Sequence, residues 1–418
     1  MVVNEYRLSY RQCLGTLLKR LGQAEAAQGP LPIQLLTGPR QVGKTTLMLE
    51  IASQHGERAL YVPCDSPESA LPGFWEQLWS RAEALAKAQG GCVLLLDEVH
   101  LLAAWASRLK AAWDRLKRKK VSLHVVATGS SALRLATGSR ESLAGRFERL
   151  TLSHWSAASL VEAFGVDESE AAELIVKEGG YPGAFGLRTE PRRWAAYVHD
   201  AILEPAIGRD ILALAPVRKP ALLRQVFAVA VSSPAQIISL KKLQGQLQDA
   251  GALETIAHYL SLLEEGYLVA SLGKFSPRPA RRMNAPPKLV VLSNALLNVA
   301  HPEGVPAPGR DAARFGAWLE NACLAHACNA GQQVLYWREE PLEVDAVIDG
   351  SWGKWAIEVK GGPVQALDLK GLLEFHKRFP QYKPLLVAGE TGRRTAQAVG
   401  VQFLTWQEYL LGTDSLPL

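Results

Sequence analysis

The sequence predicts an α/β protein with a doubly wound parallel sheet, and three observations predict it. Strand signals alternate with helix signals along the N-terminal part of the chain, which is typical of such a sheet. Residues 38–45 match the pattern G-x-x-x-x-G-K-S/T, between a short apolar strand at 33–36 and a helix signal. A second apolar run at 93–96 ends in two carboxylates, Asp97 and Glu98. The expected strands of this sheet are 33–36, 59–62, 92–96, 122–127 and 150–152.

Length and composition indicate an ordered, globular chain of two or three domains. It has 418 residues, of which 48% are hydrophobic and 21% are charged. The net charge of +5 is a mild basic excess, which is compatible with nucleic acid as a partner but does not indicate it. The five cysteines form no C-x-x-C pair, which argues against zinc and against a disulfide framework. Neither a signal peptide nor an apolar run of membrane-spanning length is evident, so we expect a cytoplasmic protein with no membrane partner.

The glycine-rich segment 38–45 has the features of a phosphate-binding loop. Its glycines let the backbone curl until several N–H groups point at phosphate oxygens, and the following helix adds its positive dipole. We expect Lys44 to reach the β- and γ-phosphates of ATP and the Thr45 hydroxyl to bind Mg²⁺. The predicted nucleotide contacts are Gly38, Pro39, Arg40, Gln41, Val42, Gly43, Lys44, Thr45, Thr46 and Ser130.

The two carboxylates after the strand at 93–96 suit metal-assisted hydrolysis. Asp97 is expected to hold the Mg²⁺, directly or through water, and Glu98 to act as the general base toward the attacking water. Asp97-Glu-Val-His100 also matches the D-E-x-H box of helicases, but no second helicase-like lobe follows, so His100 is interpreted as incidental.

Hydroxyl groups follow the next strand, at Thr128, Ser130 and Ser131. One of them could contact the γ-phosphate or position the attacking water. The same residue types also cap helices well, so capping of the next helix is the alternative.

Arg146 precedes the last strand of the sheet in the segment Leu-Ala-Gly-Arg. An arginine at this place can reach a neighbouring subunit's nucleotide and offset the charge that develops on the transferred phosphoryl group. The alternative is a solvent-exposed arginine in a basic segment that also contains Arg140 and Arg149.

Residues 240–273 read as helix, turn, helix and strand, which is the order of a winged helix. The Pro- and Arg-rich stretch 275–287 would be its wing or a linker. On the expected recognition helix, His258, Tyr259 and Ser261 are candidate DNA contacts. Three glutamates on that helix favour a protein-docking role instead, so both alternatives stay open. The flanking basic residues that could meet phosphates are Lys241, Lys242, Arg278, Arg281 and Arg282.

A second group of charged residues lies on two strands near the C-terminus. Glu358 and Lys360 are two apart on a strand and therefore share a face, and Asp345 on the neighbouring strand can meet them. The carboxylates of Asp345 and Glu358, with Glu320 from the preceding helix, would bind Mg²⁺. Lys360 would orient or deprotonate a water for attack on a phosphodiester. The alternative is alternating charge on an exposed strand face.

The motifs of the N-terminal part together resemble those of a prokaryotic AAA+ ATPase. They are the loop at 38–45, the apolar strand ending in Asp97-Glu98, Thr-Gly-Ser-Ser at 128–131, and Leu-Ala-Gly-Arg at 143–146. The resemblance implies a P-loop AAA+ sheet followed by a helical lid.

Two later segments, Gly-Gly-Tyr-Pro at 179–182 and Gly-Arg-Asp-Ile at 208–211, resemble a particular group of these ATPases, mostly of undefined function. Members of that group continue through a winged helix into a C-terminal α/β domain like the PD-(D/E)xK restriction endonucleases. The implied domains are the AAA+ module at 1–155, lid and connecting helices at 156–232, winged helix at 233–287, linker at 288–312 and nuclease-like domain at 313–418.

The resemblance implies Mg²⁺-dependent ATP hydrolysis coupled to DNA binding or remodelling, by a homo-oligomer such as a hexameric ring. Two other functions fit the same residues. One is a nucleotide-dependent regulatory switch with a catalytically dead C-terminal scaffold and a protein-binding winged helix. The other is a nucleotide-gated, metal-dependent DNA nuclease.

Overall fold

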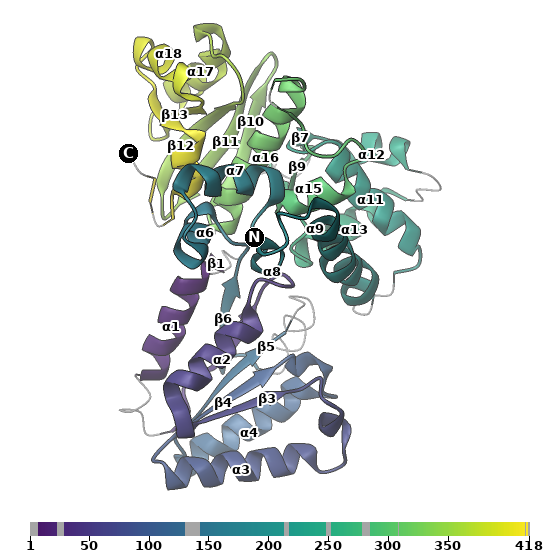
Figure 1. Cartoon of the computed structure of the whole chain (residues 1–418), viewed down its shortest axis with the longest axis vertical. Helices are drawn as coiled ribbons and strands as arrows, with labels where there is room; N and C mark the ends of the chain where they lie inside the picture. The colour runs from purple at the N-terminus through teal and green to yellow at the C-terminus, as the bar shows by residue number, and fades with distance from the viewer. Residues whose placement is uncertain are drawn as a thin grey trace. The chain divides into compact units, whose positions relative to one another are not determined.

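The structure is a computed structural model of the whole chain. It describes residues 7–22, 29–129, 143–212, 217–247, 252–277, 285–307, 309–413 and 415–416. The chain divides into two compact units, Met1–Ser153 and His154–Leu418, and each is described by itself (Figure 1).

The first unit is built on a six-stranded sheet in the order β1-β6-β2-β5-β4-β3. Every pairing in it is parallel, so each connection is a crossover, and among the described residues a helix lies in the connections that lead into β2, β3, β4 and β5. The doubly wound parallel sheet predicted from the sequence is confirmed. Its strands are β1 Arg7–Leu8, β2 Ile33–Thr37, β3 Ala59–Pro63, β4 Cys92–Asp97, β5 Leu123–Thr128 and β6 Phe147–Leu152.

Apolar faces on the helices explain how they cover this sheet. Trp75 and Trp79 of α3 and Leu109 of α4 pack with residues of β2, β4 and β5 in one hydrophobic core. Since all the strands run the same way, the segments that follow β2, β4 and β5 leave at one edge of the sheet. The helices of this unit are α1 Tyr10–Gly22, α2 Lys44–His55, η2 Gly56–Arg58, η3 Pro67–Ala70, α3 Phe74–Ala88, η4 Val99–Leu101 and α4 Trp105–Lys119.

The second unit begins with helices. The sequence predicts one long helix over 192–214, but the structure has π-helical turns in that stretch. Pro205 lies between the two π-helical segments, where its missing N–H interrupts regular helical bonding. The elements are α6 Ala157–Phe164, α7 Glu168–Glu178, α8 Pro182–Phe185, α9 Pro191–Tyr197, η5 Val198–Leu203 and η6 Ala206–Ile211.

A small three-stranded antiparallel sheet follows, in the order β7-β9-β8. The predicted linker over 288–312 is wrong at its start, because β9 and α15 lie there and are buried. The apolar run Leu289-Val-Val-Leu292 has only four residues, and so short a run does not by itself distinguish a strand from other structure. The elements are α11 Pro220–Ser232, β7 Gln236–Ile237, α12 Leu240–Gln246, α13 Leu253–Glu265, β8 Val269–Leu272, β9 Lys288–Val291 and α15 Asn294–Ala300.

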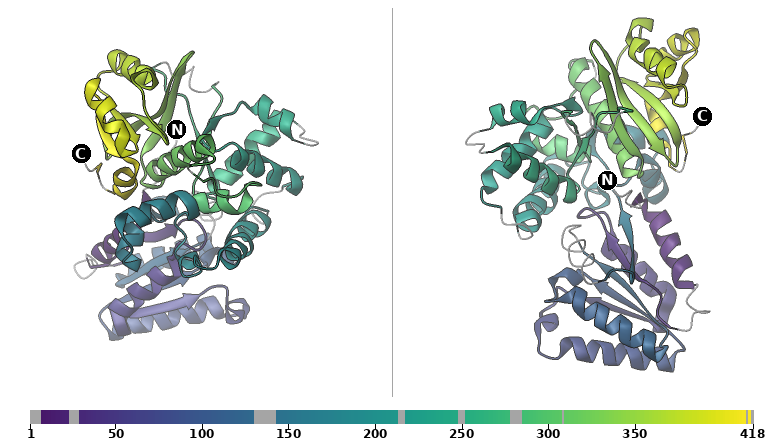
Figure 2. Two further views of the ribbon diagram at one scale, coloured as in Figure 1. Left: turned by 45° about the horizontal axis from the view of Figure 1, so that its top comes forward. Right: turned by 180° about the vertical axis from the view of Figure 1, so that it is seen from behind.

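A mixed five-stranded sheet ends the chain, in the order β10-β11-β12-β13-β14 (Figure 2). Its first three strands pair antiparallel and its last three pair parallel. From residue 313 the sequence pattern predicts one helix, three strands, a helix and a strand in this order, and the structure has them, followed by further short elements. The elements are α16 Ala312–Asn329, β10 Gln333–Glu339, β11 Leu342–Gly350, β12 Gly353–Lys360, η7 Ala366–Leu369, α17 Lys370–Arg378, β13 Lys383–Ala388, η8 Glu390–Gly392, α18 Arg393–Ala398, β14 Gln402–Thr405 and α19 Trp406–Leu411.

Within the described ranges, the structure has no helix that is both long and apolar enough to cross a bilayer.

Candidate functional site

The backbone of the loop after β2 depends on glycine at two positions. Gly38 has φ 146°, and a Cβ atom there would lie 2.1 Å from the carbonyl oxygen of Leu152, so no larger residue fits. Gly43 has φ 97° and immediately precedes α2. Both values lie in the region that glycine adopts without strain. The loop therefore turns sharply from the end of β2 into the first turn of α2, the place where helices bind anions.

Some of the predicted nucleotide contacts are buried in the loop, and others are exposed. Val42 and Lys44 are buried, whereas Gln41, Thr45 and Thr46 are exposed. Val42 holds the loop against the core, and the exposed hydroxyls are open to a ligand. Ser130 lies outside the described residues, and the other predicted contacts occupy the loop as expected from the motif.

Lys44 lies folded over its own loop. Its Nζ donates to the carbonyl oxygen of Gly38 at 3.1 Å and to that of Pro39 at 2.5 Å. These acceptors are neutral, and an anionic phosphate oxygen makes a stronger, charge-assisted bond to an ammonium group. The side chain is thus held within the loop where the motif places phosphates.

Three hydroxyl groups converge on the carboxylate of Asp97. Thr45 Oγ1 donates to Oδ2 at 2.8 Å and the hydroxyl of Tyr61 donates to the same oxygen at 2.9 Å. Thr128 Oγ1 donates to Oδ1. The predicted pair of Mg²⁺ ligands, Thr45 and Asp97, is therefore brought together. These two residues fit a Mg²⁺ ion, because hydroxyl and carboxylate oxygens are its preferred donors.

Tyr61 on β3 is a site residue that the sequence did not reveal. Burial, together with the charge of Asp97, raises the pKa of the Tyr61 hydroxyl, which keeps it protonated as a donor. Its place beside Asp97 depends on the pairing of β3 with β4, and no local pattern signals that pairing.

Glu98 is held in a left-handed conformation, with φ 53°. Such a conformation is costly for a residue other than glycine and is typical of functional sites. Its N–H donates to Thr128 Oγ1 at 3.0 Å, and its Oε2 lies 3.3 Å from Nδ1 of His100. Thr128 therefore contacts the carboxylate of Asp97 and the backbone of Glu98, and His100 contacts the Glu98 carboxylate, the predicted general base. The D-E-x-H spacing is the sequence feature that could have indicated a place for His100 beside Glu98, although the sequence analysis interprets His100 as incidental.

Arg146 is placed away from this site in its own unit. Its Nε and Nη2 bind the two oxygens of Asp114 at 2.8 and 3.2 Å, which is a bidentate ion pair. Its carbonyl oxygen accepts from the N–H of Ile33, at the end of β2 opposite the loop. A role in a neighbour's site stays a prediction, and it requires release from Asp114.

The helix α13 does not present the surface expected of a DNA-recognition helix. Tyr259, a predicted contact, is buried, and its hydroxyl accepts from the N–H of Lys219 at 3.1 Å. Glu254 and His258 are exposed, and the helix contains no lysine or arginine. The interpretation of Tyr259 as a DNA contact is therefore wrong.

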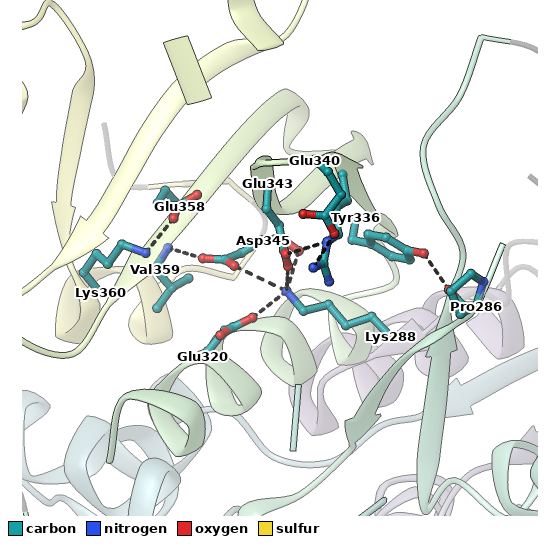
Figure 3. A network of polar contacts seen from close by, with 11 residues as sticks. Pro286, Lys288, Glu320, Tyr336, Glu340, Glu343, Asp345, Glu358, Val359 and Lys360 are labelled. Atoms are coloured by element: carbon teal, nitrogen blue, oxygen red, sulfur yellow. Dashed lines mark hydrogen bonds and ion pairs between the residues drawn. The ribbon is translucent and has the colours of Figure 1, made fainter. Parts of the chain in front are cut away.

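The C-terminal carboxylates gather around a lysine from the small sheet. Lys288 of β9 is almost fully buried, and its Nζ lies 2.5 Å from Glu320 Oε1 and 3.3 Å from Asp345 Oδ1. A third carboxylate oxygen, Glu343 Oε1, lies 3.6 Å away. Figure 3 shows the ammonium group of Lys288 between the side chains of Glu320, Asp345 and Glu343. Because Lys288 belongs to the expected linker, no sequence pattern indicated its position among these carboxylates.

Protonation within this group follows from burial and charge. Burial alone would lower the pKa of Lys288, but Asp345, Glu320 and Glu343 raise it above its ordinary value. Burial and the charge of Asp345 raise the pKa of Glu320 to about 8, with Lys288 opposing them. Burial would also raise the pKa of Asp345, but the two neighbouring lysines and a backbone N–H lower it. Lys288 and Asp345 therefore form the buried ion pair of this group.

Glu358 and Lys360 meet on one face of β12 as predicted, with Lys360 Nζ 2.6 Å from Glu358 Oε1. Asp345 Oδ2 accepts the N–H of Val359 at 2.9 Å, which ties β11 to β12 at this point. Burial and the charge of Asp345 raise the pKa of Glu358 well above its ordinary value.

These residues do not fit the predicted metal ion in this arrangement. Glu320 and Asp345 come together as expected, but they surround an ammonium group. Among the residues that the structure describes, no group of three or more His, Cys, Asp or Glu side chains could hold a metal ion. The predicted ligand set of Glu320, Asp345 and Glu358 is thus corrected to two linked ion-pair clusters, one on Lys288 and one on Lys360.

Family models match three successive parts of the chain. Residues 31–161 match the model of an AAA domain. The N-terminal part therefore contains an AAA-type P-loop module. Residues 169–307 and 315–409 match two domains of unknown function, DUF8612 and DUF4143.

Two uncharacterized proteins resemble most of the chain. They are Mb2031c of Mycobacterium bovis and Rv2008c of Mycobacterium tuberculosis, each 25% identical over 335 residues. The match covers 79% of this chain and 70% of each relative.

Solved structures of P-loop proteins are similar at low sequence identity. The Walker-type ATPase PABY2304 of Pyrococcus abyssi has 16% identity and a TM-score of 0.47, over 72% of this chain and 99% of that chain. The ORC2 protein of Aeropyrum pernix, in its ADPNP–ADP complexes, has 16% identity and a TM-score of 0.40, over 74% and 92% of the two chains.

Proposed function

We propose that this protein hydrolyses ATP in a Mg²⁺-dependent reaction. One observation carries the proposal. The Thr45 hydroxyl that ends the phosphate-binding loop lies 2.8 Å from the carboxylate of Asp97, which ends β4, the next strand but one from β2 in the sheet. The match of residues 31–161 to an AAA domain supports the same chemistry.

Each residue of the module has a role in this reaction. Lys44 would bind the phosphates, and Thr45 and Asp97 would hold the Mg²⁺, which offsets negative charge on the phosphates. Glu98 would accept a proton from the attacking water. Thr128 accepts from the backbone N–H of Glu98 and donates to the carboxylate of Asp97, so it would hold the Glu98 backbone in place beside Asp97.

The test is the steady-state ATPase rate of the Glu98→Gln variant beside a matched control. We expect the rate to fall about a hundredfold or more, because general-base catalysis contributes on that scale, with ATP binding retained. The control is Glu76→Gln, the same change on the exposed face of α3, which should leave the rate unchanged. A Glu98→Gln variant with the wild-type rate would contradict the proposal.

We further propose that hydrolysis is coupled to DNA through residues 233–291. The order α11, β7, α12, α13, β8, β9 and the antiparallel sheet β7-β9-β8 support a winged helix. Lys241 and Lys242 are exposed on α12, where they could meet backbone phosphates.

The coupling is tested by the ATPase rate and by DNA binding, each with single-stranded, duplex and branched DNA. We expect stimulation of the rate and salt-sensitive binding that weakens in a Lys241→Glu/Lys242→Glu variant. The control is Lys87→Glu on the exposed face of α3. No binding by the wild type would rule out this coupling and leave the ATPase proposal intact.

A second candidate is a nucleotide-dependent switch in which the second unit binds protein. It is favoured by the absence of lysine and arginine from α13 and by the ammonium group in the C-terminal carboxylate cluster. Its expected signature is an ATPase rate that no DNA changes, with a protease-cleavage pattern that differs between ATP and ADP. A nucleotide-gated nuclease would need a metal at Asp345 and Glu358, and the position of Lys288 opposes that.

A further inference from the structure

The ammonium of Lys288 occupies a position that is surrounded by oxygen atoms. Glu320 Oε1, Asp345 Oδ1 and Glu343 Oε1 lie 2.5, 3.3 and 3.6 Å from Nζ, and the carbonyl oxygen of Asp345 lies 3.4 Å away. Carboxylate and carbonyl oxygens are the donors that hard divalent cations prefer. The ammonium group therefore has the oxygen-rich surroundings that a bound metal cation would have.

Lys288 is held firmly in this position by its strand. β9 is the central strand of its sheet and pairs with both β7 and β8. Both backbone groups of Val291 bond to the side-chain amide of Asn321, at 2.9 and 2.8 Å. Just before the strand, the hydroxyl of Tyr336 donates to the carbonyl oxygen of Pro286 at 2.5 Å (Figure 3). Contacts from α16 and β10 thus fix the backbone on both sides of the lysine.

The need for a cation is a consequence of burial. Asp345 is buried and the side chain of Glu320 is only 17% exposed, and a buried carboxylate is costly unless an opposite charge or a proton accompanies it. Lys288 supplies that charge from within the chain, and it is itself only 1% exposed.

We propose that Lys288 is a built-in substitute for a metal ion. Its ammonium fills the cation position between Glu320 and Asp345, so the C-terminal domain holds no divalent cation there, and removal of the lysine creates a site that binds one. This inference is independent of the ATPase proposal, since every group in it belongs to the second unit.

The test is Mn²⁺ binding by the full chain without nucleotide, measured by electron paramagnetic resonance, with the melting temperature measured in parallel. We expect the Lys288→Ala variant to bind one additional Mn²⁺ per chain, at least about tenfold more tightly than any binding by the wild type. Mn²⁺ should also raise its melting temperature more than it raises that of the wild type. Lys354→Ala, a half-exposed lysine on β12, is the matched control and should behave as the wild type.

A second variant locates the new site and guards against misfolding. Lys288→Ala/Asp345→Asn removes both members of the buried ion pair, so it should fold and should lose the added Mn²⁺ site. The proposal is overturned by a Lys288→Ala protein that gains neither Mn²⁺ binding nor stabilisation by Mn²⁺. It is also overturned by a wild-type protein whose own Mn²⁺ site disappears in Asp345→Asn.

Discussion

Thr128 connects the carboxylate of Asp97 with the backbone N–H of Glu98 through one hydroxyl group. It donates to Asp97 and accepts from the N–H of Glu98, so a single atom fixes both the expected metal ligand and the expected base. The sequence indicated a useful hydroxyl at this strand end, but it did not reveal these partners. They depend on the alignment of β4 with β5, which is a long-range contact.

We predict that Thr128→Val lowers the maximal ATPase rate by about 10–100-fold, the usual cost of losing a group that orients a site residue. Valine has nearly the same shape, so the fold should persist. Thr128→Ser keeps the hydroxyl and should retain most of the rate. Equal rates for the valine and serine variants would show that the hydroxyl is not needed.

The burial of His124 leads us to expect that the stability of the fold depends on pH. The residue is buried, its Nδ1 accepts from the N–H of Leu31 at 3.2 Å, and its Nε2 bonds to Ser122 at 3.0 Å. Burial, helped by nearby His55, lowers the pKa of His124 from 6.5 to about 4. Between these values the unfolded chain binds a proton that the folded chain does not.

Stability should therefore fall as the pH falls from about 6.5 to about 4, by up to about 3 kcal/mol for this residue. The measurement is denaturant unfolding followed across that pH range. In a His124→Asn variant the free energy of unfolding should change less steeply with pH over this range, whatever its stability at neutral pH. The same pH dependence of stability in the variant and the wild type would show that His124 does not contribute to it.

At the scale of elements, the sequence predicted the helices and the central strands well, because each has a strong local pattern. The expected helix at 74–88 is α3, and the apolar runs are β4 and β5. The missed elements β9 and α15 lie beside a Pro- and Arg-rich stretch and have short apolar runs. Consequently Lys288, the residue that changes the interpretation of the C-terminal carboxylates, could be placed only by the structure.

The loop between β2 and α2 should tolerate no side chain at its first glycine. A Cβ at Gly38 would meet the carbonyl oxygen of Leu152 at 2.1 Å, so Gly38→Ala must displace the loop. We predict loss of measurable ATP binding in this variant. Gly15→Ala on α1 is the control, because a Cβ there meets nothing within 4 Å and alanine favours helix. ATP binding by Gly38→Ala at the wild-type affinity would contradict this reading of the loop.

At the scale of the whole molecule, the proposed homo-oligomer makes a prediction about Arg146. If Arg146 serves a neighbour's nucleotide, Arg146→Ala and Glu98→Gln proteins are each inactive alone but recover activity when mixed and allowed to reassemble. In the mixture some sites combine an intact Glu98 with an intact Arg146 from the next subunit. The measurement is the ATPase rate against the mixing ratio.

A mixture with no more activity than its components would confine Arg146 to its ion pair with Asp114. Asp114→Asn provides the control, since it frees the arginine without removing it and should retain activity. As a further control, mixing the wild type with Glu76→Gln, a change on the exposed face of α3, should leave the activity unchanged.

The central claim is that the loop at 38–45 binds ATP with Mg²⁺ beside Asp97. Calorimetric titration of the wild-type chain with ATP in the presence of Mg²⁺ tests it most directly, with Lys44→Ala titrated in parallel. We predict one ATP per wild-type chain and at least about a tenfold loss of affinity in Lys44→Ala. Absence of binding by the wild type, or equal affinity in the two proteins, would contradict the claim.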